Sequence, residues 1–264
     1  MKKYLWFLFF GVLICALKCS LIYGSEVVLP ATQIEKGKVS FLLLYGDTSE
    51  KLNFHVTGRE QIRVGNNSYF SNVSNDLESD GRSSDVSVKL VINPDNGLYY
   101  WFKAGVSDYS LDIPSDTVKN NLSGQDKGLI CGFGARKLLF PDTIVSPAVA
   151  VGLGVNYAVY GLDSFRSGDS APVVVNDKLE ITEFQADVVI SKKLDKFEPY
   201  GGVKVYRKNV TLTDRASIAN VSGAKDDAGL FFGTRFSYFK NEALIVEGSF
   251  VGDTSFTAGV NINF

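Results

Sequence analysis

The single histidine, His55, is the residue best suited to acid–base chemistry in this chain. In the stretch Asn53-Phe54-His55-Val56-Thr57, alternate side chains of an extended strand point the same way, so the imidazole and the Thr57 hydroxyl share a face. A histidine beside a hydroxyl can activate it as a nucleophile. The preceding Glu50-Lys51-Leu52 supplies no aspartate for a His-Asp pair. We expect His55 to be a structural residue of an interior or rim, and we predict no catalytic residue.

The sequence also lacks a residue pattern typical of a metal-binding or phosphate-binding site. His55 and Cys131 are 76 positions apart, which leaves only carboxylates as ligands. The acidic clusters Asp226-Asp227 and Asp76 to Asp80 lie in polar stretches, where a solvated surface is the simplest interpretation and calcium at a rim is a minor alternative. Gly132-Phe133-Gly134 lies within a strand-like run and not ahead of a helix, so it is no phosphate loop. We predict no metal and no cofactor.

A second set of chemistry-bearing residues consists of charged side chains inside strand-like stretches. Each lies on the face opposite the apolar residues of its stretch, and five are basic while two are acidic: Lys89, Lys103, Arg136, Asp187, Lys204, Arg235 and Glu247. If the apolar faces meet lipid, these charges point inward, because a charge on the lipid face near the midplane costs about 2–4 kcal/mol. Two interpretations stay open. The charges pair and fill a narrow interior, or they line a small pore with a mild preference for anions.

The elements that would position these charges are clearest at the end of the chain. From Thr254 to Phe264, apolar and small or polar residues alternate, as in a strand with one apolar face. The apolar positions are Phe256, Ala258, Val260, Ile262 and Phe264. This segment resembles the closing strand of bacterial outer-membrane β-barrel proteins, which end in an aromatic residue preceded by apolar residues at every second position. The resemblance implies location in the outer membrane, contact with its lipid, and recognition of these five residues by the barrel-assembly machinery.

The same alternation recurs along the chain. Asn96-Gly97 supplies a hairpin turn between two alternating runs, 86–92 and 98–106. Short turns are predicted near 94–97, 140–146, 192–198, 239–242 and 252–253, and a further turn at Gly46-Asp47-Thr48-Ser49. Long polar loops are predicted for 59–84, 107–127, 161–177 and 208–227. Eleven candidate strands result, and since a barrel with both ends on one side needs an even number, we predict ten or twelve, with ten preferred.

Inward-facing glycines indicate how such an interior is filled. They are Gly132, Gly134, Gly152, Gly154, Gly202, Gly229, Gly233 and Gly259. Large rings at Tyr99, Trp101, Tyr206 and Phe231 fall on the same side of their strands. A ring can lie over a neighbouring residue that lacks a side chain, so we expect an interior that is filled more than open.

The amino-terminal stretch predicts export. Lys2 and Lys3 precede an apolar run from Tyr4 to Leu17, which has the layout of a secretory signal peptide. We assign residues 1–25 to the signal peptide, 26–37 to a short lead-in and 38–264 to the barrel. Without residues 1–25, the chain keeps 24 basic against 29 acidic residues, which argues against nucleic acid as a partner. One cysteine, Cys131, then remains, so an internal disulfide is excluded.

The sequence therefore predicts an all-β, closed antiparallel transmembrane barrel with short periplasmic turns and long extracellular loops. Its expected role is that of a non-catalytic, monomeric structural or surface protein of the outer membrane, with a narrow pore for small solutes or ions as one form of that role. The alternative from another class is a secreted soluble β-barrel that binds a small apolar ligand, like a lipocalin. A third and weaker alternative is a lipid-hydrolysing barrel. His55 and Thr57 faintly resemble the His-x-Ser arrangement of outer-membrane phospholipases, although Thr replaces Ser.

Overall fold

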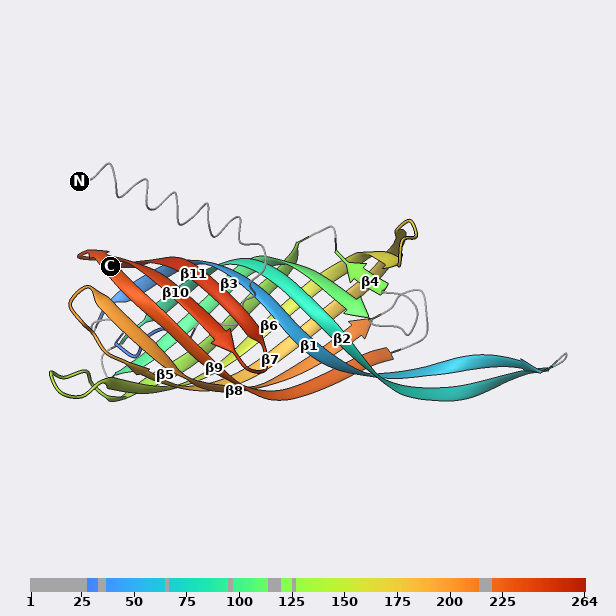
Figure 1. The fold of residues 1–264 in the computed structure, drawn as a ribbon, viewed down its shortest axis with the longest axis horizontal. Helices are drawn as coiled ribbons and strands as arrows, with labels where there is room; N and C mark the ends of the chain where they lie inside the picture. The colour runs from blue at the N-terminus through green and yellow to red at the C-terminus, as the bar shows by residue number, and fades with distance from the viewer. Residues whose placement is uncertain are drawn as a thin grey trace.

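The computed structural model describes residues 28–32, 37–64, 67–94, 97–113, 120–124, 127–213 and 220–264. The predicted signal peptide lies outside these residues. The described chain forms eleven antiparallel strands (Figure 1). In chain order, their bounds are β1 Val39–Val64, β2 Asn67–Ile92, β3 Leu98–Ile113, β4 Asn120–Ser123, β5 Gly128–Phe140, β6 Ala148–Ser167, β7 Val173–Ser191, β8 Phe197–Thr213, β9 Asn220–Phe239, β10 Glu242–Phe250 and β11 Thr254–Asn263. No helix in this part of the chain is long and apolar enough to cross a membrane.

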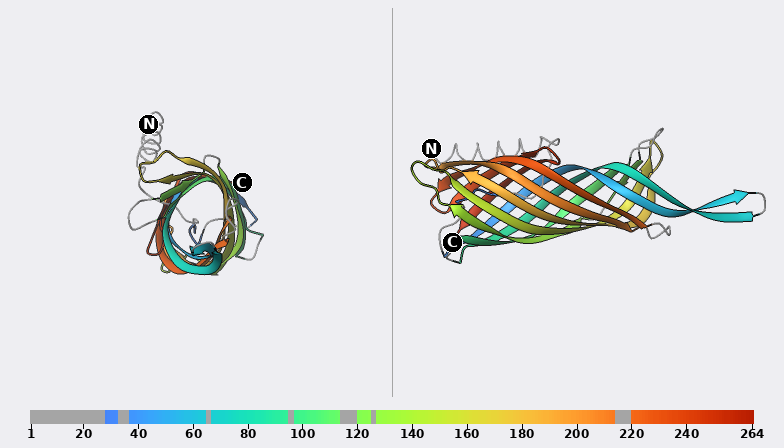
Figure 2. Two further views of the ribbon diagram at one scale, coloured as in Figure 1. Left: turned by 90° about the vertical axis from the view of Figure 1, so that its right-hand side faces the viewer. Right: turned by 90° about the horizontal axis from the view of Figure 1, so that it is seen from below.

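Ten of the strands close into a ring, seen along its axis in Figure 2. Each strand pairs with the next, and β11 returns to β1 with register Ser40↔Asn263 through Ser49↔Thr254. The four-residue β4 lies between the far ends of β3 and β6 and takes no other part in the ring. The prediction of a closed antiparallel barrel with ten strands is thus confirmed.

The two ends of the barrel differ. One end, here the turn end, carries the short connections 93–97, 141–147, 192–196 and 240–241, together with Phe264. The opposite end, here the hairpin end, carries the remaining connections. The β1–β2 hairpin projects from it well beyond the other strands, because β1 pairs with β9 only as far as Thr57↔Asn220 while its pairing with β2 continues to Val64↔Asn67. At about 3.3 Å per residue, the projecting part is about 20 Å long.

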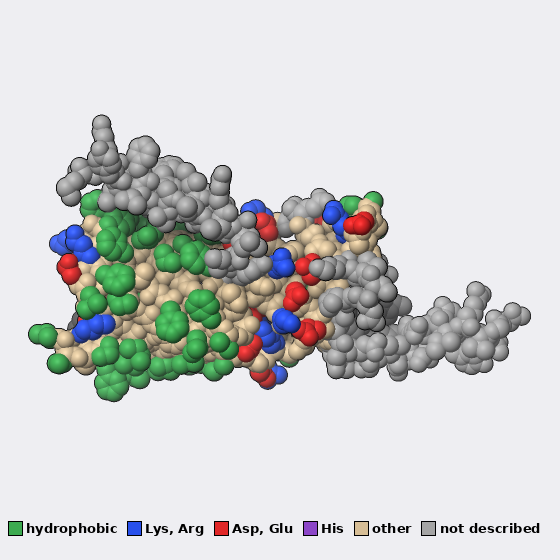
Figure 3. Space-filling view, viewed as in Figure 1, with side chains coloured by type: hydrophobic (Ala, Val, Ile, Leu, Met, Phe, Trp, Pro, Cys, Tyr) green, Lys and Arg blue, Asp and Glu red, His purple; other side chains and the backbone are tan. Residues whose placement is uncertain are grey.

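Near the turn end, the wall is inside out relative to a soluble barrel. Outward side chains form an apolar belt, and its large members are strongly exposed, such as Leu153 at 68% and Phe133 and Phe232 at 59% each. Figure 3 shows this belt as a band of hydrophobic side chains over the turn-end half of one face. The inward positions of the same strands carry buried charges, including Lys89, Lys204 and Glu247.

Towards the hairpin end, the polarity of the alternation reverses. Inward positions become apolar and fully buried, as at Leu52, Leu162 and Leu179. Outward positions carry exposed ion pairs such as Lys51–Glu78 and Arg207–Asp226. Charges gather over this half of the face in Figure 3. A wall that needs lipid along only part of its height changes its outward residues where water begins.

This reversal explains where the predicted strand bounds were wrong. The predicted turn at 46–49 does not exist, since β1 runs from Val39 to Val64 without interruption. The apolar residues change from odd to even positions between Tyr45 and Leu52 because the outside of the wall changes from apolar to polar. The predicted loop 59–84 is the β1–β2 hairpin. The predicted loops 107–127, 161–177 and 208–227 are also largely occupied by strand ends.

Candidate functional site

The barrel interior is the candidate site, and it is filled in three levels along the axis. At the turn end, apolar side chains such as Leu42, Phe231 and Ile245 pack with buried ion pairs. In the middle lies a polar cavity of about 100 Å³, lined by Glu50, Lys103 and others. At the hairpin end, a second apolar cluster closes the interior with Leu52, Phe54, Tyr109, Leu111, Leu122, Tyr160, Leu162, Leu179, Ile181, Val210 and Leu212.

Two buried ion pairs cross between strands at the turn end. The Arg136 guanidinium of β5 lies 3.0 Å from the Asp187 carboxylate of β7. The Arg235 guanidinium of β9 lies 2.6 Å from the Glu198 carboxylate of β8. All four side chains are at most 8% exposed. Buried charges are tolerated when they are paired in this way, so these pairs fill the interior without a net charge.

Residues 28–32, part of the predicted lead-in, also lie inside the turn end. The backbone amide of Val28 donates to both oxygens of Glu247, at 3.0 and 3.1 Å. The amide of Ala31 donates to the Ser191 hydroxyl at 3.2 Å, and Arg136 donates to the carbonyl of Leu29 at 3.0 Å. The short segment therefore occupies the axis of the barrel.

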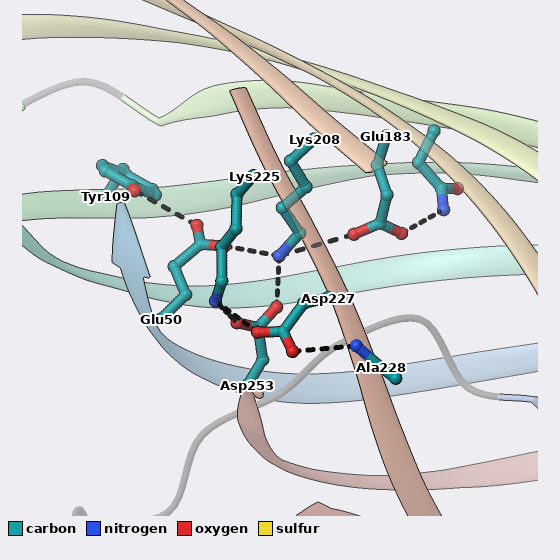
Figure 4. Close-up of polar contacts among 9 residues, drawn as sticks. Glu50, Tyr109, Glu183, Lys208, Lys225, Asp227, Ala228 and Asp253 are labelled. Atoms are coloured by element: carbon teal, nitrogen blue, oxygen red, sulfur yellow. Dashed lines mark hydrogen bonds and ion pairs between the residues drawn. The ribbon is translucent and has the colours of Figure 1, made fainter. Parts of the chain in front are cut away.

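A buried ionic cluster surrounds Lys208 in the middle level (Figure 4). Its ammonium contacts the carboxylates of Glu50, of Asp253 at 2.5 Å and of Glu183 at 3.4 Å. Lys225 adds a contact of 2.7 Å to Asp253. Three strands and the β10–β11 turn thus meet through the Lys208 ammonium, and Lys225 joins a fourth strand, β9, to the same turn.

Asp253 lies in that turn, outside the strands. Its burial opposes ionisation, but the ammonium groups of Lys208 and Lys225 outweigh that effect and hold the pKa of the carboxyl below its usual range. Its charge therefore contributes stability at neutral pH, and that contribution is lost as the pH falls below the ordinary aspartate pKa. The turn itself is strained, since Val251 has a φ of 70°, which a β-branched residue rarely adopts.

The structure places all seven predicted lumen-facing charges on the inward side of their strands. Lys89, Arg136, Asp187, Lys204, Arg235 and Glu247 are buried, and Lys103 is 12% exposed with the Asp85 carboxylate at 3.6 Å. Among the seven, Arg136 and Asp187 form an ion pair with each other. The Lys89 ammonium lies 4.2 Å from the centre of the Trp101 ring.

The sequence prediction missed other interior charges, among them Glu50, Asp85, Glu183, Glu198, Lys208, Lys225 and Asp253. A signal for three of them was present, because Lys208, Glu183 and Lys225 have the same odd or even parity as Lys204, Asp187 and Arg235 on their strands. Lys208 and Lys225 fall within the predicted loop 208–227, because the prediction ends strands where the outward apolar residues stop.

The predicted terminal apolar residues lie on the outward side of β11, as partly exposed members of the belt at Phe256, Ala258, Val260 and Ile262, with Phe264 exposed at 72%. The side chains of His55 and Thr57 lie outside the described part of the structure, although their backbone continues β1. Within the described residues, no group of His, Cys, Asp and Glu side chains has the arrangement of a metal site.

Inward glycines make room for rings, as at Gly154. A Cβ there would lie 2.5 Å from the Trp101 ring, while the nearest backbone atom would be 3.6 Å away. Gly154→Ala should therefore lower the free energy of unfolding by about 1–3 kcal/mol through overpacking. Urea titration in detergent micelles measures this effect. In a Trp101→Leu background, the same substitution should cost much less, and an equal cost in both backgrounds would contradict the contact.

The fold and its filled interior define a class: a closed antiparallel barrel with a lipid-facing belt is an integral outer-membrane β-barrel protein, because such closure satisfies every backbone hydrogen bond in hydrocarbon. No protein-family model and no curated protein sequence matches the chain.

Among solved structures, the chain is similar to the translocator domain of the autotransporter NalP from Neisseria meningitidis, at 10% identity and a TM-score of 0.44, over 88% of this chain and 90% of that one. It is also similar to the outer membrane protein OprG from Pseudomonas aeruginosa, at 10% identity and a TM-score of 0.42, over 87% and 97%. A third similar structure is Ail, the attachment invasion locus protein of Yersinia pestis, at 11% identity and a TM-score of 0.33, over 87% and 100%. The assignment to the class rests on the geometry of this chain.

Proposed function

We propose that this protein is a non-catalytic surface protein of the outer membrane whose barrel is closed to the passage of ions. The observation that carries the proposal is the filled interior. Residues 28–32 and two ion pairs occupy the turn end, the Lys208 cluster occupies the middle, and Leu52, Leu162 and Leu179 pack across the hairpin end. The function then resides in what the barrel presents outside the membrane.

The outer surface offers two features for that role. The β1–β2 hairpin extends beyond the rest of the wall, and exposed ion pairs such as Lys127–Asp108 and Arg82–Asp112 surround its base. The turn end faces the periplasm in this proposal, and the residues from Phe256 to Phe264 present the pattern for the barrel-assembly machinery. Neither the mildly acidic chain nor its paired outer charges favours nucleic acid as a partner.

A narrow pore is the second candidate, and the polar cavity of about 100 Å³ favours it. That cavity has the basic side chains Lys103 and Lys208 beside the acidic Glu50, Asp85 and Glu183. It is large enough for several waters. A path through the barrel would require both apolar ends to open.

Planar-bilayer recording separates the two candidates. We expect the full-length exported protein, with insertion verified by flotation of the same proteoliposomes, to give no discrete current steps, because apolar packing closes both ends of the cavity. Regular steps with a reproducible ion preference would contradict the closed barrel and establish the pore.

A further inference from the structure

We propose that the turn end of the barrel is a peptide-binding site and that residues 28–32 occupy it as a removable plug. This segment belongs to no strand, yet Val28, Leu29 and Ala31 are each only 1% exposed. Their side chains belong to the same apolar cluster as Trp101, Phe231 and Ile245. The segment is therefore packed as deeply as the barrel's own inward residues.

The barrel recognises this segment mainly through its backbone. Glu247 of β10 accepts hydrogen bonds from two consecutive amides, those of Val28 and of Leu29, the latter at 3.4 Å. Arg136 of β5 and Ser191 of β7 bind the Leu29 carbonyl and the Ala31 amide. Three separate strands thus contribute buried polar groups that match donors and acceptors of one short peptide segment. Such an arrangement recognises the backbone of a peptide in addition to its side chains.

Side-chain contacts complete the site. Thr32 donates its hydroxyl hydrogen to Glu198, which also accepts a hydrogen bond of 2.9 Å from Ser191 and pairs with Arg235. Leu29 has a φ of 67°, a conformation that a leucine rarely adopts. A residue persists in such a conformation only where its surroundings determine it. The site therefore fixes the shape of the segment, which is typical of specific binding.

The segment is tethered to the barrel in a way that permits release. β1 begins seven residues after the segment, and just before β1 Gly37 donates its amide hydrogen to the Asn93 carbonyl at 2.9 Å. If export removes residues 1–25, as the sequence predicts, residue 28 lies close to a free amino terminus. The segment can then leave the barrel without unpairing any strand, and an unattached peptide of the same sequence can take its place.

Peptide binding tests this inference independently of conductance. The peptide-binding proposal can fail while the barrel remains closed to ions, and the barrel can conduct ions while the peptide still binds. The protein is a mature chain that begins at residue 33, refolded in detergent micelles, and the probe is a fluorescent peptide of residues 26–35. We expect saturable binding by anisotropy, at least tenfold tighter than that of a scrambled peptide. A peptide N-methylated at the amides of Val28 and Leu29 should bind as weakly as the scrambled one, because it lacks both donors to Glu247.

Variants of the shortened chain identify the site. Glu247→Gln should weaken binding about tenfold, because a hydrogen bond to a charged group is roughly twice as strong as a neutral one. Glu78→Gln, at an exposed carboxylate of the outer wall, should leave binding unchanged. Binding equal to that of the scrambled peptide, or equal binding by the full-length chain, would overturn the proposal.

A second measurement uses the chain of residues 26–264, which keeps residues 28–32 and has Cys131 as its single cysteine, and it does not depend on folding of the shortened chain. Ala31→Cys in a Cys131→Ser background should react with a water-soluble thiol reagent at least tenfold more slowly than Lys240→Cys, an exposed position in the β9–β10 turn. Adding Glu247→Gln should raise the rate at position 31 alone. Equal rates at positions 31 and 240 would show that the segment does not occupy the barrel, and would contradict the proposal.

Discussion

Lys208→Met should lower the free energy of unfolding by about 3–5 kcal/mol, because it removes one partner of a buried ionic network and leaves the others uncompensated. The Lys208 side chain is 6% exposed, and its three carboxylate partners, Glu50, Glu183 and Asp253, are at most 12% exposed. Without the cation, the three anions face one another, with Lys225 left to compensate only Asp253. Urea titration in detergent micelles, followed by tryptophan fluorescence, measures the loss.

A matched control distinguishes burial from charge. Lys51 also pairs with a carboxylate, Glu78 at 2.7 Å, but these side chains are 69% and 57% exposed. Lys51→Met should therefore change the free energy of unfolding by at most about 1 kcal/mol. Adding Glu50→Gln to Lys208→Met should recover part of the loss, since it removes one of the unpaired charges. Equal losses for Lys208→Met and Lys51→Met would show that the cluster is hydrated and not buried.

The cluster also explains how the wall holds together where β10 ends and β11 begins. The pairing of β1 with β11 stops at Ser49↔Thr254, and β1 next pairs with β9 from Phe54↔Gly223. Between those points, the β10–β11 turn lies between two longer strands. Asp253 of that turn is bound by Lys208 and Lys225, from β8 and β9. Ion pairs thus join the wall where the strand ladder is interrupted, so the effect of Lys208→Met should extend beyond a single contact.

The period of the sequence was sufficient to predict the ring, and it assigned each charged residue to one side of the wall. Alternation in a half-apolar wall has a period of two, so each residue's parity gives its side of the sheet. The inward position of Lys204 and the outward position of Val203 follow from parity alone. The count of eleven candidates and the requirement for an even number left ten or twelve strands, and the extra candidate arose from the predicted turn at 46–49 within β1.

The height of the wall could not be predicted in the same way. Above the belt, the alternation continues with its polarity reversed, so Leu52 and Phe54 are inward where Phe41 and Leu43 are outward. A reversal of phase in one strand and a turn between two strands produce the same pattern. Tertiary surroundings decide between them, here the pairing of residues 46–49 with both β2 and β11.

The occupant of the turn end was also beyond prediction from the sequence. Residues 28–32 show no alternation of apolar and polar residues. Their contacts come from five strands that are distant from them in the chain. The residues concerned are Arg136, Ser191, Glu198 and Glu247, with Trp101 in the same apolar cluster. Glu247 was predicted to be inward from its parity. That its partners are backbone amides is visible only in three dimensions.

Leu153→Arg should lower the free energy of unfolding of the barrel in a bilayer by about 2–4 kcal/mol, because Leu153 lies midway along the apolar belt and an arginine there meets hydrocarbon. Its cross-strand neighbours are Ala135 and Ala186, and its side chain is 68% exposed to whatever surrounds the barrel. In a soluble protein, a residue as exposed as this one tolerates arginine within about 0.5 kcal/mol. The two settings thus predict different results for one substitution.

Ile144→Arg provides the control, because Ile144 is 99% exposed but lies in the 141–147 connection at the turn end, beyond the belt. It should be nearly neutral in either setting. Reversible folding into lipid vesicles, measured against urea for both variants, gives the comparison. A large loss for Leu153→Arg with none for Ile144→Arg supports hydrocarbon around the belt. Equal and small effects would mean that water surrounds Leu153, and a barrel with Phe133, Leu153 and Phe232 in water would need a protein partner to cover them.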